Sequence, residues 1–101
     1  MGWATNYINE LKGGKTISFR PRGNSMVGRI SSGQLCTVVP VTEKTELRKG
    51  DIVLCYVGGS QYLHLIKSIK GNQYRISNNK GHVNGTTTRK NIFGLCVKVE
   101  S

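Results

Sequence analysis

The chain has 101 residues, of which 37% are hydrophobic, so it is long enough for one domain with a modest core and too short for two. Its 15 Lys and Arg outnumber 5 Asp and Glu, which gives a formal net charge of +10. No apolar run approaches the roughly 20 residues that span a bilayer, and residues 1–11 lack the apolar core of a signal peptide, so we expect a single domain over residues 1–101 and no membrane partner.

One short amphipathic helix is predicted near the N-terminus, over residues 3–12. Apolar side chains recur there at helical spacing, at Trp3, Tyr7, Ile8 and Leu11. Gly13-Gly14 follows as a signal for the end of a helix. The polar face is not basic, so we interpret the apolar stripe as core packing rather than as a membrane anchor.

The rest of the chain has the pattern of short β-strands separated by polar or glycine-rich turns. Extended segments are predicted over residues 15–20, 34–41, 51–57, 62–69, 73–77 and 91–99. Gly58-Gly59 and Gly71-Asn72 mark tight turns, whereas residues 42–50 and 78–90 are polar and are predicted to be loops. The fold class is therefore mainly β: a small coiled sheet or partly open barrel with one short N-terminal helix.

Cys36, Cys55 and Cys96 each lie inside an apolar run, and metal-ligand spacing such as CxxC is absent from the sequence. We interpret the three cysteines as buried free thiols in a reducing compartment. The expectation is a cytoplasmic protein with no metal and no cofactor.

Positive charge dominates the second half of the chain, because residues 52–99 contain no Asp or Glu. Such a field attracts nucleic acid or an acidic protein, although it could equally serve only to keep a small protein in solution. The basic surface is assigned to Lys67, Lys70, Arg75, Lys80, Arg89 and Lys90.

A candidate nucleophile, Ser25, lies in the segment FRPRGNSMVGRI between two predicted strands. A nucleophilic serine needs an exposed turn, backbone N–H groups that hold an oxyanion, and a base within reach. Gly23 and Gly28 would let a substrate backbone approach on either side. The alternative is that Ser25 does no more than make a turn.

Four segments, taken in order, resemble the LexA and signal-peptidase superfamily of serine peptidases: GNSMVGRISSGQLCTVV, LRKGDIVLCYV, YLHLIKSIKGNQYRISNN and FGLCVKV. In that family a G-[ND]-S-M box carries the nucleophile, and a G-D-I-V strand, a strand with the general base and a closing G-x-V strand follow. The resemblance covers residues 16–99 and implies a peptidase-like β core of the LexA C-terminal and signal-peptidase catalytic type.

The resemblance also implies roles for individual residues. Ser25 matches the nucleophile, whose own N–H would help to form the oxyanion hole, and His64 falls where the general base belongs. Gly23, Asn24 and Met26 are assigned to the oxyanion hole and substrate groove. LexA-type and bacterial signal peptidases place a lysine at the base position, whereas the archaeal and endoplasmic-reticulum enzymes place a histidine, so the chain resembles the histidine branch. An imidazole with an ordinary pKa of about 6.5 is mostly neutral at pH 7 and can act as a base.

Two departures from the family pattern bear on activity. Gly28 stands where the family has the proline of SMxP. The family's acidic GDN segment reads Ser77-Asn78-Asn79, and Asn84 stands near the second acidic position, so the acid that would orient His64 is missing. An amide can hold an imidazole, but it stabilises the developing positive charge less than a carboxylate does. Asn78, Asn79 and Asn84 are the candidates for orienting His64.

Other interpretations of the titratable groups stay open. His64 could be a packing residue, since it lies in an apolar strand with Tyr62 and Ile66 on the same face. His82 lies in a polar loop, where solvation is the simplest interpretation. Lys67 and Lys70 match the position of the base less well than His64 does.

Two functions are consistent with this sequence, and whether the chain is an enzyme is undecided between them. The first is a serine peptidase-like hydrolase with Ser25 as nucleophile and His64 as base, acting weakly or no longer, on an extended peptide added beside a strand edge. The second is a non-catalytic basic module on the same fold that binds nucleic acid or an acidic protein. By analogy, a small domain of this kind would suit a phage or mobile-element protein.

Overall fold

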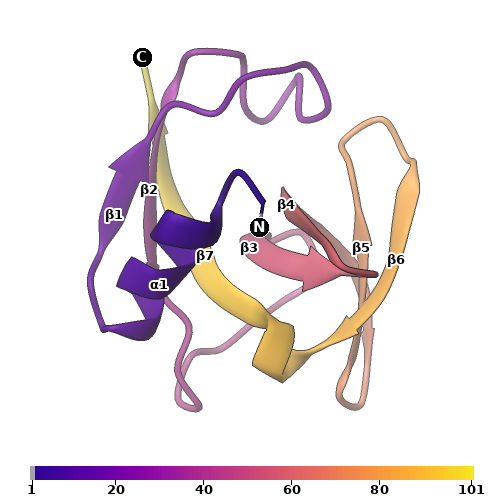
Figure 1. Ribbon diagram of the computed structural model, residues 1–101. Coiled ribbons are helices and arrows are strands. Elements are labelled where there is room, and N and C mark those ends of the chain that lie inside the picture. Colours follow the sequence, from indigo (N-terminus) through magenta and orange to yellow (C-terminus); the bar gives the residue numbers. More distant parts are fainter. Residues whose placement is uncertain (1) are drawn as a thin grey trace.

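The computed structural model describes residues 2–101, which form one α-helix, seven strands and a short 3-10 turn (Figure 1). Helix α1 spans Thr5–Lys12. The strands are β1 (Ile17–Phe19), β2 (Leu35–Pro40), β3 (Ile52–Val57), β4 (Ser60–Lys70), β5 (Gln73–Ser77), β6 (Val83–Thr88) and β7 (Ile92–Glu100). The 3-10 turn η1 (Arg89–Asn91) joins β6 to β7. Within residues 2–101, no helix has the length and apolar character needed to cross a membrane.

The strands form a single antiparallel sheet in the order β1-β2-β7-β3-β4-β5-β6. The sheet is strongly curved but not closed, so β1 and β6 are its two edges (Figure 1). Strand β7 pairs with both β2 and β3, so the last strand joins the two halves of the sheet. The predicted fold class, a mainly β and partly open barrel with one short helix, is confirmed.

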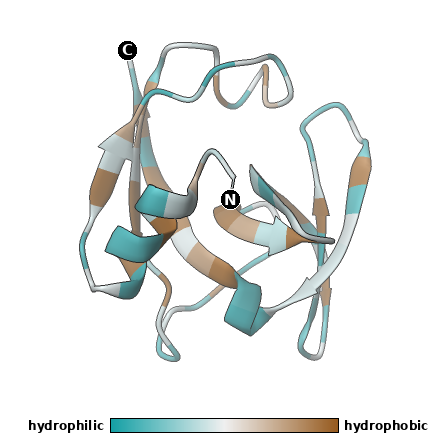
Figure 2. Ribbon diagram, in the orientation of Figure 1, coloured by the Kyte–Doolittle hydropathy of each residue, from teal (hydrophilic) through white to brown (hydrophobic). Residues whose placement is uncertain are grey.

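The core lies on both sides of strand β3. Leu54 packs with Ile8 and Leu11 of α1, whereas Val53 and Cys55, on the opposite face of the strand, pack with the β4–β5 half of the sheet. Hydropathy follows this arrangement, with apolar residues along β3 and β7 and polar residues in the hairpin turns (Figure 2). Strand β3 is covered on both faces and is therefore fixed in the core. Strand β4 pairs with it along Ile52–Val57 and is held in place by this pairing.

Helix α1 ends in a Schellman motif, as the Gly13-Gly14 pair predicts. The N–H of Lys15 donates to the carbonyl of Glu10 at 3.0 Å, and the N–H of Gly14 donates to the carbonyl of Leu11 at 3.0 Å. Gly14 has a φ of 87°, whereas Gly13 has a φ of −80° and needs no glycine.

Replacing Gly14 by Ala is expected to lower the free energy of unfolding by about 1 kcal/mol, because an L-residue with left-handed dihedrals is strained. Gly13→Ala is the matched control and should cause no such loss. Chemical denaturation of both variants measures the difference, and an equal loss in the two would contradict the left-handed cap.

The predicted loop over residues 78–90 is wrong in its second half. Residues Val83–Thr88 form strand β6, which pairs antiparallel with β5, and Arg89–Asn91 form η1. Because β6 is an edge strand, only Thr87 in it is buried, so the segment lacks the apolar alternation of an internal strand. The predicted loop over residues 42–50 is confirmed.

The three cysteines are free, but only Cys36 and Cys55 are buried; Cys96 is half-buried, which corrects the prediction for that residue. Burial raises the pKa of Cys36 to about 11 and that of Cys55 to about 12. Thiols with such pKa values stay protonated at neutral pH and are poor nucleophiles.

Candidate active site

Ser25 lies in the long turn that connects β1 to β2, and the turn is anchored in the core on its far side. Met26 and Ile30 are buried, and the N–H of Ile30 donates to the carbonyl of Met26 at 2.7 Å. The N–H of Val27 closes a second turn on the carbonyl of Asn24 at 3.3 Å. Ser25 itself is half-buried, so its hydroxyl is presented at the surface by a fixed backbone.

Asn79, from the loop between β5 and β6, holds the same turn from outside. Its backbone N–H donates to the carbonyl of Ser25 at 2.9 Å, and its side-chain amide donates to the carbonyl of Val27 at 2.7 Å. Asn79 therefore contacts the backbone around the candidate nucleophile, and its amide does not reach the His64 ring to which the sequence assigned it.

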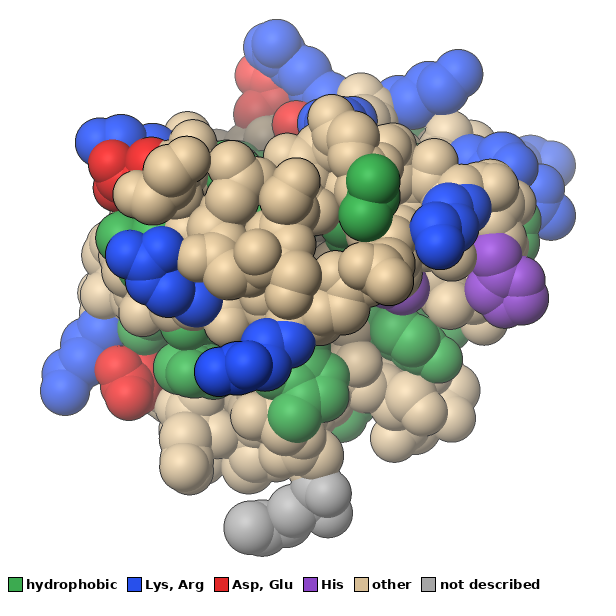
Figure 3. Space-filling view, turned by 90° about the horizontal axis from the view of Figure 1, so that it is seen from above, with side chains coloured by type: hydrophobic (Ala, Val, Ile, Leu, Met, Phe, Trp, Pro, Cys, Tyr) green, Lys and Arg blue, Asp and Glu red, His purple; other side chains and the backbone are tan. Residues whose placement is uncertain are grey.

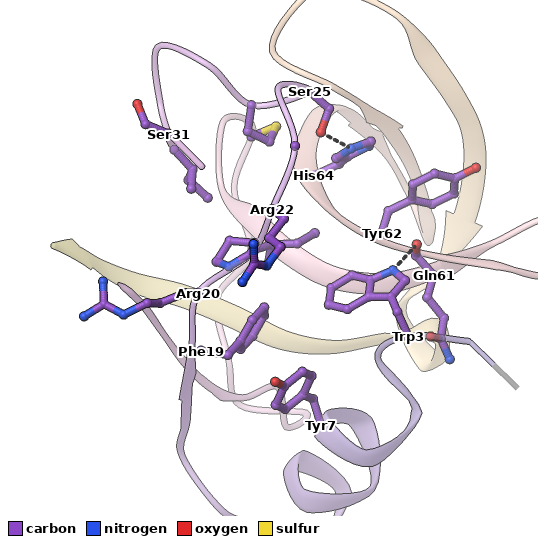
Figure 4. A pocket seen from close by; sticks show the side chains of 15 residues that line it. Trp3, Tyr7, Phe19, Arg20, Arg22, Ser25, Ser31, Gln61, Tyr62 and His64 are labelled. Carbon is purple, nitrogen blue, oxygen red and sulfur yellow. Dashed lines mark hydrogen bonds between the residues drawn. The ribbon is translucent and has the colours of Figure 1, made fainter. Parts of the chain in front are cut away.

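His64 lies on β4 opposite Val53 of β3, and its ring joins Ser25 to Asn84. Figure 4 shows the contact with Ser25. Nε2 of His64 is 3.1 Å from the Ser25 hydroxyl oxygen, and Nδ1 is 2.6 Å from the Asn84 amide oxygen. An amide oxygen can only accept, so the proton lies on Nδ1 and Nε2 is left as the acceptor for the Ser25 O–H. This is the tautomer that a general base needs.

The environment of His64 favours the neutral ring. The side chain is 8% exposed, and the ring stacks on Tyr62 with centroids 4.9 Å apart. Burial lowers the pKa of His64 below its ordinary value, the hydrogen bond to Asn84 opposes that shift, and the nearby His82 adds to it. His64 is therefore uncharged at pH 7 and able to accept a proton.

Of the three candidate asparagines, Asn84 on β6 is the one that contacts the ring. Asn78 instead folds its own loop, because its side-chain oxygen accepts the backbone N–H groups of Lys80 and His82, each at 2.9 Å. The sequence could not choose among the three, since the choice depends on the irregular register between β5 and β6, where Ser77 pairs with Val83.

A pocket of about 440 Å³ opens beside the Ser25–His64 pair (Figure 4). Residues 19–23, Ser25 and Met26 line one side of it, residues 61–64 of β4 line the other, and Trp3 and Tyr7 close one end. Gly23 and Met26 belong to this lining, whereas Asn24 is exposed beside it. In the described part of the chain, the N–H groups of Ser25 and Met26 donate to no backbone or side-chain acceptor.

Gly28 explains why the family proline is absent. Its φ of 98° lies in the left-handed region, whereas a proline ring fixes φ near about −65°. A Cβ at this position would also lie 2.9 Å from the Asn79 side-chain nitrogen. In this protein glycine and Asn79 together shape the turn that carries Ser25.

The residues assigned to a basic surface are not all free to face a partner. Figure 3 shows Lys and Arg side chains spread around the face that it views. Arg89 is half-buried and donates to the carbonyls of Thr42 and Thr45, so it holds a loop rather than facing a partner. The other five, namely Lys67, Lys70, Arg75, Lys80 and Lys90, are exposed. Binding of nucleic acid by these residues stays a prediction.

Comparison with known proteins agrees with the fold and with the sequence motifs. A family model described as Peptidase S24-like matches residues 3–97, which is nearly the whole chain. No curated protein matches the chain significantly. The chain belongs to the Peptidase S24-like family, within the LexA and signal-peptidase superfamily that its sequence resembles.

Proposed function

We propose that the protein is a serine peptidase in which Ser25 is the nucleophile and His64 is the general base, with Asn84 as a positioning residue. The observation that carries this proposal is the continuous chain of hydrogen bonds from the Ser25 hydroxyl through the His64 ring to the Asn84 amide oxygen. Nucleophile, base and orienting group are each within reach of the next, which is the arrangement that acyl transfer requires.

In the first step, Ser25 Oγ would bond to the carbonyl carbon of the scissile peptide while its proton moves to His64 Nε2. The negative charge that develops on the carbonyl oxygen would be held by the N–H groups of Ser25 and Met26. His64 would then return the proton to the leaving amine, which leaves an ester on Ser25, and water would hydrolyse that ester with His64 again as base.

The substrate would be an extended peptide that pairs with the free edge of β4. Strand β5 begins to pair with β4 only at Leu65, so residues 60–64 have β3 on one side and no strand on the other. A peptide added at this edge would run along the pocket toward Ser25. Because an amide orients His64, we expect turnover to be slow.

A fluorophosphonate probe tests the proposal without knowledge of the substrate. Its phosphorus bonds to the nucleophilic oxygen, fluoride leaves, and the base takes the proton. Mass spectrometry should find the adduct on Ser25 in the unmodified protein, and Ser25→Ala should abolish it. Ser31 lines the same pocket without contacting His64, so Ser31→Ala is the matched control and should label normally. Absence of an adduct, or an adduct that persists in Ser25→Ala, would contradict the proposal.

The labelling rate should rise with pH to a plateau whose midpoint lies below 6.5, because only neutral His64 accepts a proton and its pKa is lowered from that value. By the same shift, His64 should contribute stability that is present above its unfolded pKa and lost as the pH falls through its folded pKa. Rates measured from about pH 4.5 to pH 8 check the first expectation. His82→Ala should move the midpoint upward, since His82 lowers the pKa of His64. A midpoint above 6.5 in the unmodified protein would rule out His64 as the base.

A further inference from the structure

The pocket beside Ser25 has a wall of three aromatic rings. The rings of Tyr7 and Phe19 stack with centroids 4.4 Å apart, and the ring of Trp3 lies 5.9 Å from that of Phe19. Phe19 is buried beneath the other two, whereas Trp3 is 53% exposed. Trp3 therefore presents a large apolar surface to the pocket instead of completing the core.

This exposed ring is held in a fixed position by Gln61 of β4. The indole N–H of Trp3 donates to the backbone carbonyl of Gln61 at 3.1 Å, and the N–H of Ala4 donates to the Gln61 side-chain oxygen at 2.6 Å. The Gln61 amide in turn donates to Thr5 and Tyr56, each at 3.0 Å. An exposed aromatic ring whose orientation is fixed in advance loses little entropy when it binds, which is typical of recognition surfaces.

The aromatic wall and the Ser25–His64 pair lie along the same open strand edge. The carbonyl of Gln61 faces away from β3, since Trp3 reaches it, and the alternation of an antiparallel strand then directs the N–H and carbonyl of Leu63 to the same edge. Gln61 and His64 are three residues apart, about 10 Å along an extended chain. A peptide paired here would place a side chain on the aromatic wall within about four residues of the reacting carbonyl.

The pocket is lined by two positively charged side chains, Arg20 and Arg22. Figure 4 shows Arg22 between the Ser25–His64 pair and Phe19, whereas Arg20 points away and donates to the carbonyl of Gly33 at 2.7 Å. No Asp or Glu lines the pocket, and in residues 2–101 no carboxylate forms an ion pair with Arg22. A carboxylate on a bound peptide would supply the missing partner.

We propose that this pocket selects extended peptides that carry a bulky apolar side chain, seated against Trp3, and an acidic side chain that faces Arg22. The inference builds on the proposed peptidase function by naming its substrate class. Trp3 and Arg22 are then the residues that determine specificity, and Gln61 positions Trp3.

Binding to the Ser25→Ala protein tests the preference separately from catalysis. Trp3 is the only tryptophan in the chain, so its fluorescence reports occupation of the pocket. The probes are ten-residue peptides of Ser, Thr and Ala with one fixed Leu and a single Glu placed at each other position in turn. We expect at least one of these Leu–Glu spacings to shift the Trp3 emission saturably. Replacing the Leu of that peptide by Ser, or its Glu by Lys, should weaken binding at least tenfold.

Variants of two arginines make the test specific. In the Ser25→Ala background, Arg22→Glu should reverse the preference, so that Lys-containing peptides bind better than Glu-containing ones. Arg29→Gln removes an exposed arginine of the same turn that does not line the pocket, so it is the matched control and should keep the preference for Glu. Anisotropy of a fluorescein-labelled Leu–Glu peptide should show weaker binding to Trp3→Ala, in which the natural reporter is lost.

The outcomes separate the two proposals. The proposed substrate class is wrong if no peptide changes the Trp3 emission, or if peptides with and without Glu bind equally well. Selective binding by a protein whose unmodified form does not react with fluorophosphonate would keep the peptide preference and reject the peptidase. Labelling of Ser25 without peptide selectivity would support the peptidase and reject the peptide preference.

Discussion

Replacing Asn84 by Asp is expected to speed the reaction of Ser25 by between about tenfold and about ten-thousand-fold. The reverse change in a serine triad on a different fold costs about ten-thousand-fold in turnover, which sets the upper limit. Asn84 already lies 2.6 Å from Nδ1 of His64, so a carboxylate would take up the same contact. Its negative charge would stabilise the imidazolium that forms as the proton leaves Ser25.

The rate of fluorophosphonate labelling measures this effect, and the pH profile provides a second readout. Asn84→Asp should also move the midpoint of the profile upward, because a nearby carboxylate raises the pKa of His64. Asn78→Asp adds the same charge on a loop that does not contact the ring, so it is the matched control and should change the rate little. If Asn84→Asp folds normally and its rate and midpoint match those of the unmodified protein, Asn84 does not position His64.

Replacing Gly28 by Ala is expected to lower the free energy of unfolding by about 2–3 kcal/mol and to slow the labelling of Ser25. A left-handed alanine costs about 1–2 kcal/mol, and displacement of the Asn79 amide from the Val27 carbonyl costs about 1 kcal/mol more. Reactivity should fall along with stability, because the Asn79 amide holds the carbonyl of Val27, two residues after Ser25 in the same turn.

A double-mutant cycle with Asn79→Ala separates the two contributions. Removing the Asn79 side chain relieves the steric conflict but not the backbone strain, so the double variant should lose less stability than the sum of the two single variants. Denaturant unfolding of the four proteins gives the coupling energy. Simple additivity would show that Gly28 and Asn79 do not act on each other, in contradiction to the 2.9 Å approach of a Cβ at position 28.

The fold could be predicted where local signals agree with tertiary packing. The apolar run of β3 and the Gly71-Asn72 turn between β4 and β5 are strong signals, and both elements form as expected. Strand β6 could not be found by apolar periodicity, because an edge strand that is largely exposed needs few apolar side chains. Its four β-branched residues, Val83 and Thr86–Thr88, were the available signal, although they lie among glycines and asparagines typical of loops.

The candidate site was predictable only through the family resemblance. Ser25 and His64 are 39 residues apart in the chain, and no local pattern indicates that such residues meet. The spacing of Trp3 fits the helix and predicts a core residue, yet α1 begins at Thr5, and Trp3 lies before it and is exposed. Gln61 and Arg22 carried no signal, since an isolated polar residue in a strand or turn is usually exposed.

The position of Asn84 on β6 ties reactivity to an edge of the sheet. As an edge strand, β6 pairs with β5 alone, and strands of this kind open locally at a lower free energy than the whole molecule unfolds. Each opening would release Asn84 from His64 and let the ring rotate or change tautomer while the rest of the sheet stayed intact. Warming should therefore abolish the reactivity of Ser25 at temperatures where the core still resists hydrogen exchange. Loss of reactivity and global unfolding would then have separate midpoint temperatures.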